Sequence, residues 1–92
     1  MNLTASGIEG ELEDGVFDGL RKMHTLNLGD NRISSIGLRV FDGSVLQSLR
    51  YVNISWNRIR TLEPWPFSIG VNHTVTIDLA MNEIMSFTNT MR

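Results

Sequence analysis

The feature that most constrains this chain is an internal repeat with a period of about 25 residues. Asn31, Asn57 and Asn82 follow one another at intervals of 26 and 25 residues, and the apolar residues around them fall into one register. Around the second Asn the register reads Leu46-x-x-Leu49-x-x-Val52-x-Ile54-x-x-Asn57-x-Ile59-x-x-Leu62, with Phe67 ten residues after the Asn. A fixed period of this length predicts stacked units, because one such unit cannot bury its apolar face alone.

The repeat also divides the chain. Its 92 residues hold about three and a half units and predict a single domain over 1–92, with units near 1–22, 23–48, 49–73 and 74–92. In the first unit Ser6 replaces the Asn, and either Val16 or Phe17 fills an apolar position. In the last unit Phe87 comes only five residues after Asn82, whereas the Phe of the two middle units comes ten residues after the Asn. Neither end carries a capping unit, so we expect a fragment of a longer array, a truncated product, or end-to-end self-association through the termini.

The pattern resembles the leucine-rich repeat over nearly the whole chain. The Phe ten residues after the Asn, the unit length and the segment Gly15-Val16-Phe17-Asp18-Gly19-Leu20 resemble the "typical" subclass of animal extracellular proteins such as Toll-like receptors and variable lymphocyte receptors. The segment Ser6–Leu12 is closer to the plant-type repeat. The resemblance implies an α/β solenoid, an arc with a short-stranded parallel β-sheet on its concave face and irregular or short helical segments on its convex side.

Strand alternation predicts which residues of each Leu-x-Leu segment form an exposed surface. Leu26 and Leu28 face the core and their neighbours face solvent, and the other units repeat this arrangement. Trp56 stands out, because aromatic side chains are enriched among binding hot spots. Its alternative role is structural, lying flat and covering Asp30 or Met81. The predicted ligand contacts on the concave face are Thr25, Asn27, Asp30, Tyr51, Ser55, Trp56, Thr76, Asp78 and Met81.

Two further sets of residues are predicted to hold the units together. Asn31, Asn57 and Asn82 end the strands, and an amide that both donates and accepts can satisfy backbone groups of adjacent units, which predicts a buried structural ladder with Ser6 as a weaker first rung. Phe41 and Phe67 are expected to stack behind the strands. Pro64-Trp65-Pro66 cannot be helical in its middle, because Trp65 precedes a proline. The return segment of the third unit, which leads from its strand back to the next unit, is therefore expected to be irregular.

Three Asn-x-Ser/Thr sequons suggest N-glycosylation, at Asn2, Asn53 and Asn72. Asn2 and Asn53 occupy the central outward position of a strand, and Asn72 precedes the fourth strand. A glycan on Asn53 would lie beside Tyr51 and Trp56 and compete there with a flat protein ligand.

Composition and motifs exclude most chemical functions. The chain has no Cys and a net charge of −2, which argues against thiolate sites and nucleic-acid binding. No apolar run is long enough to insert into a membrane. His24 and His73 lack partners at metal-ligand spacing, and neither a nucleophile elbow nor a phosphate loop occurs, so no enzyme, metal or cofactor is expected.

Two groups of charged residues are expected to be solvated. The convex loop of the first unit is expected to carry the carboxylates Glu9, Glu11, Glu13, Asp14 and Asp18, and one edge of the sheet is expected to carry Arg32, Arg58 and Arg60.

The sequence therefore predicts a non-catalytic module that recognises a protein or glycan ligand. The family resemblance implies part of an extracellular or cell-surface receptor or adhesion ectodomain in a longer chain. Two alternatives remain open. The first is an intracellular, cytoplasmic scaffold or adaptor, which the absence of Cys and of a secretion signal favours and in which the sequons are accidental. The second is a structural spacer within a longer array.

Overall fold

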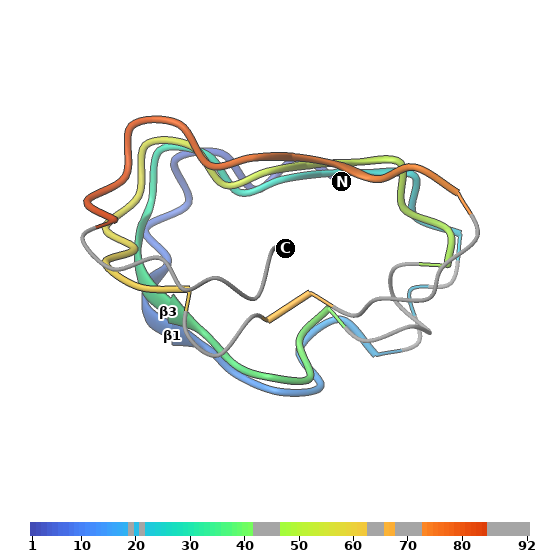
Figure 1. Ribbon diagram of the computed structural model, residues 1–92, viewed down its shortest axis with the longest axis horizontal. Helices are drawn as coiled ribbons and strands as arrows, with labels where there is room; N and C mark the ends of the chain where they lie inside the picture. The colour runs from blue at the N-terminus through green and yellow to red at the C-terminus, as the bar shows by residue number, and fades with distance from the viewer. Residues whose placement is uncertain (19, 21, 42–46, 63–65, 68–72, 85–92) are drawn as a thin grey trace.

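The computed structural model describes residues 1–18, 20, 22–41, 47–62, 66–67 and 73–84 (Figure 1). Over these residues the chain forms strands and turns and no helix, so the α part of the predicted α/β class is not found there. The predictions for Pro64, Trp65, Asn72 and Phe87 lie outside the described residues. The five strands are β1 (Glu9–Leu12), β2 (Thr25–Asn27), β3 (Arg32–Ile36), β4 (Tyr51–Asn53) and β5 (Thr76–Asp78).

The three Leu-x-Leu segments form one parallel sheet in the order β2-β4-β5. Leu26 pairs with Val52, and Val52 with Ile77, so residues one repeat apart become lateral neighbours. An isolated bridge between Asn2 and Asn27 extends this register into the first unit. Viewed down the shortest axis, successive passes of the chain run along one another and their strands coincide in projection (Figure 1). The repeat period thus sets the strand register.

A second, two-stranded parallel sheet pairs β1 with β3, with a register shift between Gly10 and Glu11. The sequence predicted a convex loop here, and that prediction is wrong for Glu9–Leu12. The reason is backbone pairing between adjacent units, in which Arg32 N donates to Ile8 O at 2.7 Å and Gly37 N donates to Leu12 O at 2.8 Å. Glu9 and Glu11 are nevertheless exposed, while Leu12 turns inward.

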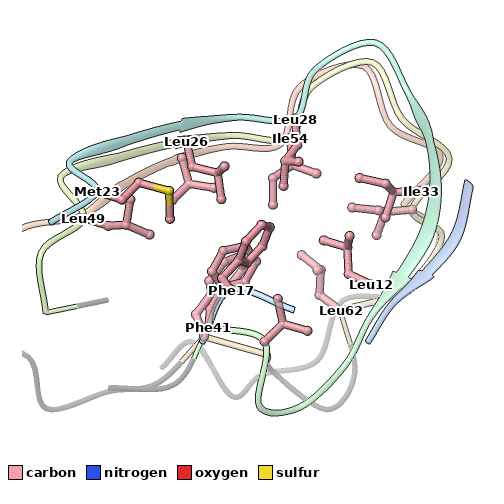
Figure 2. Close-up of a cluster of buried hydrophobic side chains, with 14 residues drawn as sticks. Leu12, Phe17, Met23, Leu26, Leu28, Ile33, Phe41, Leu49, Ile54 and Leu62 are labelled. Carbon is pink, nitrogen blue, oxygen red and sulfur yellow. The ribbon is translucent and has the colours of Figure 1, made fainter. Parts of the chain in front are cut away.

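One apolar core fills the space between the two sheets and the return segments (Figure 2). Leu26, Leu28 and Ile54 enter it from the strand side, and Leu12, Ile33 and Leu62 enter it from the side of β1 and β3. Opposite the strands the aromatic rings stack, with Phe41 5.0 Å from Phe67 and 5.8 Å from Phe17 between ring centroids. Of the two candidates for the apolar position in the first unit, Phe17 fills it, because Phe17 is 4% exposed whereas Val16 is 52% exposed.

Gly37 directly follows β3, beside the end of the paired strand β1, and there is no room for a side chain. A Cβ on Gly37 would lie 2.9 Å from the Leu12 carbonyl oxygen and would collide with Asp14 Oδ1, which is itself held by the Arg39 N–H at 2.8 Å. We expect Gly37→Ala to lower the free energy of unfolding by about 1–2 kcal/mol. Urea denaturation followed by tryptophan fluorescence measures this loss.

Gly29→Ala is the matched control. A Cβ there would meet its nearest neighbours, Asn27 Oδ1 and Asn53 Nδ2, at 3.2 and 3.4 Å. The equivalent positions of the next two units already hold Ser55 and Ala80. We therefore expect a loss of about 0.5 kcal/mol. Equal losses in the two glycine variants would contradict this account of the contact at Gly37.

Candidate recognition surface

Each strand of the main sheet ends in a turn that an Asn or Asp side chain closes. Asn2, Asn27, Asn53 and Asp78 lie in one lateral register, and we call them the Asx row. In every member Oδ1 accepts the N–H of the residue two positions later, at distances of 2.8–3.0 Å. Such Asx turns fix the backbone at the end of a strand.

One residue after each of these turns the backbone becomes left-handed. The φ values are 53° at Ala5, 55° at Asp30, 56° at Trp56 and 59° at Met81. Residues with a Cβ adopt this conformation at a cost of about 1–2 kcal/mol, and a bulky side chain such as Trp is rare there. Asp tolerates it best among the four. We call these left-handed positions the corners, and the end of the strands at which they lie the rim. Because the four corners share one backbone conformation, every unit places a side chain at the same position on the rim.

The amides that follow the corners join neighbouring units, and we call Asn31, Asn57 and Asn82 the amide ladder. Asn57 Nδ2 donates to the carbonyl oxygens of Leu28 and Ile54 at 3.0 and 3.1 Å. Its Oδ1 accepts the Ile33 N–H at 3.0 Å. Asn31 and Asn82 donate in the same way to carbonyls of their own unit and the preceding unit. Ser6 is exposed, and its backbone N–H donates to Asn31 Oδ1.

At the rim, the side chains at the left-handed positions remain in solvent. Trp56 and Met81, in adjacent units, are each 59% exposed, and Asp30 is also exposed. Trp56 shields neither of its neighbours, so the alternative covering role does not fit this geometry. We call Asp30, Trp56 and Met81 the corner ridge. Figure 1 shows the stacked corners together at one end of the strands.

The other predicted contact residues lie on the open face of the β2-β4-β5 sheet, and they divide into two groups. Thr25 and Thr76 are exposed and Tyr51 is half-buried. Asn27, Ser55 and Asp78 are engaged in the Asx turns, and Ser55 is only 9% exposed. The Asx row was not predicted from the sequence, although an Asn or Asp at four aligned positions was its visible signal.

The remaining polar groups do not gather into a reactive centre in the part of the chain that the structure describes. There, no group of three His, Cys, Asp or Glu side chains could hold a metal ion. His73 Nε2, just before the fourth unit, lies 3.0 Å from the Leu49 carbonyl oxygen. Arg32, Arg58 and Arg60 are exposed on the flank. The described residues also contain no helix long and apolar enough to span a bilayer.

Comparison with known proteins assigns the class of this fold. The leucine rich repeat family model matches residues 1–59, and the chain belongs to that family, which confirms the resemblance drawn from its repeat. The human protein "Leucine-rich repeats and immunoglobulin-like domains protein 1" is 41% identical to this chain over 73 residues. That match covers 78% of this chain and 6% of the human protein, so the chain spans a small part of its relative's length. No solved structure matches the chain.

Proposed function

We propose that residues 1–92 form one solenoid domain that recognises a protein, without catalysis, as part of an extracellular receptor or adhesion ectodomain. Leucine-rich repeat domains generally mediate protein binding, which supports the recognition role. The sequons and the resemblance to extracellular repeats support the compartment. The observation that carries the proposal is the exposure of Trp56 and Met81 side by side on the corner ridge, 59% each.

The corner ridge has the physical properties of a binding hot spot. Trp56 offers a large apolar ring, and its backbone is held by a hydrogen bond from Trp56 N to Ala80 O at 3.1 Å. A fixed backbone removes part of the conformational entropy that would otherwise be lost when a partner covers the side chain. Burial of a Trp in the centre of an interface is commonly worth about 2 kcal/mol or more. The ridge is mainly apolar, which favours a protein ligand over a glycan.

Trp56→Asn separates binding from folding. Asn is favoured in left-handed backbone and Trp is not, so the substitution is expected to stabilise the chain by about 0.5–1 kcal/mol while it removes the ring. Urea denaturation of the variant measures this gain. A clear loss of stability would mean that the Trp56 ring packs against the fold, and it would contradict a purely recognition role.

The binding test uses the whole chain, displayed multivalently, against an array of secreted ectodomains. We expect at least one partner whose binding falls by a factor of about 30 or more with Trp56→Asn, corresponding to about 2 kcal/mol. Leu38→Ala is the control, because Leu38 is equally exposed at 59% but lies outside the corner ridge. Partners that respond equally to both variants, or an array without partners, would overturn the proposal.

A further inference from the structure

Two of the three sequons place their Asn in the Asx row. Asn2 bridges to Asn27, and Asn27 pairs with Asn53, so Asn2 and Asn53 lie in one line across the open face with one unit between them. In that middle unit the residue two positions after Asn27 is Gly29, and the sequon is incomplete. The face therefore presents complete acceptor sequons in alternate units.

The hydrogen bonds of these amides leave the attachment atom free. Asn53 Oδ1 accepts the N–H of Ser55 at 2.8 Å and its hydroxyl at 2.6 Å, whereas Asn53 Nδ2 donates no hydrogen bond to the described part of the chain. The amide ladder is the opposite case, since Asn57 Nδ2 donates to three carbonyl oxygens. A sugar on Nδ2 would break the bonds of the ladder and none of those of the Asx row.

A glycine of the preceding unit borders the attachment atom of Asn53. A Cβ added to Gly29 would lie 3.4 Å from Asn53 Nδ2, so this nitrogen borders a position that carries no side chain. The same position holds Thr4, Ser55 and Ala80 in the other units. Asn53 is half-buried and Gly29 is buried, and the missing side chain at Gly29 removes one group that would crowd Nδ2.

We propose that Asn53, together with Asn2, carries an N-linked oligosaccharide on the open face. In this transfer Nδ2 loses a proton and bonds to the anomeric carbon of the sugar, while the bond from that carbon to a lipid pyrophosphate breaks and the lipid pyrophosphate leaves with the proton. The Asx turn at Asn53 stays intact because it uses Oδ1. The proposal rests on the extracellular placement above, and a glycan on Asn53 would exclude a flat protein ligand from the open face beside Tyr51 and Trp56.

The test expresses the whole chain behind a secretion leader in mammalian cells and analyses the secreted, protease-resistant fraction by glycopeptide mass spectrometry. We expect glycan on Asn53 in most molecules. Ser55→Ala is expected to abolish it while keeping the backbone N–H that closes the turn, as Ala80 does in the next unit. Asn53→Gln serves less well, because a longer side chain disrupts the Asx turn.

Gly29→Ala tests the role of the missing side chain. It creates no sequon, but its methyl group borders Nδ2, so we expect a severalfold lower fraction of secreted chains with glycan on Asn53. Secreted, folded chain with unmodified Asn53 would overturn the proposal. So would glycan confined to retained, protease-sensitive chain. Either result leaves the Trp56→Asn binding test unaffected, so failure of the glycan site and failure of the recognition role are distinguishable.

Discussion

Phe41→Ala is expected to lower the free energy of unfolding by about 3–5 kcal/mol. Phe41 is fully buried, and its ring lies between Phe17 and Phe67, so truncation removes the middle member of the aromatic stack. The surrounding units are tied by backbone pairing and cannot collapse into the cavity, because Phe41 and Phe67 also form a bridge between units. Urea denaturation followed by tryptophan fluorescence measures the loss.

Since a domain of this size has a total stability of about 5–14 kcal/mol, Phe41→Ala can leave much of the chain unfolded. Phe41→Leu keeps most of the volume and is expected to lose about 1–1.5 kcal/mol, which remains measurable. Leu38→Ala, at a residue that is 59% exposed, should change stability by less than about 0.5 kcal/mol. Similar losses for the buried and exposed positions would show that the aromatic stack does not organise the core.

The second large effect is expected at Asn57→Ala, with a loss of about 2–3 kcal/mol. The Ile33 N–H loses the acceptor that joins it to the next unit, and three carbonyl oxygens each lose a donor. Asn2→Ala, at an exposed residue, is the matched control, because the Asn2 side chain makes a single hydrogen bond, in which Oδ1 accepts the Thr4 N–H. Equal denaturation midpoints for these two variants would contradict a structural role for the amide ladder.

The ladder also predicts coupling between its members. The Leu28 carbonyl oxygen accepts from both Asn31 and Asn57, so either single variant leaves it one donor and the double variant leaves it none. The double variant is therefore expected to lose about 1 kcal/mol more than the sum of the single losses. A double-mutant cycle in urea measures this excess, and strict additivity would show that the shared carbonyl is unimportant.

Much of this arrangement could be predicted from the apolar period. The core positions Leu26, Val52 and Ile59 and the stacking partners Phe41 and Phe67 all follow from aligning the repeats on their Asn residues. The candidate recognition surface was harder to predict from the sequence. Alternation along a strand indicates which side chains face solvent, but it does not separate an exposed residue such as Thr25 from Ser55, whose hydroxyl and N–H both bond Asn53.

The strand at Glu9–Leu12 shows a second kind of difference. Its sequence, Glu-Gly-Glu-Leu, has little intrinsic strand preference, and it pairs because β3 of the next unit lies alongside it. Propensity measured along one segment does not report a partner that is 23 residues away.

By itself, the sequence determined the family, the repeat period, the core residues and the absence of the usual catalytic motifs, because these depend on residue types at fixed spacing. Tertiary structure decided the second sheet, the left-handed corners that expose Trp56, and which Asn amides are held and which are free. Those features depend on the backbone torsions at each corner and on hydrogen bonds between units about 25 residues apart. Apolar periodicity carries no information about these torsions or hydrogen bonds, because it specifies only which side chains are buried.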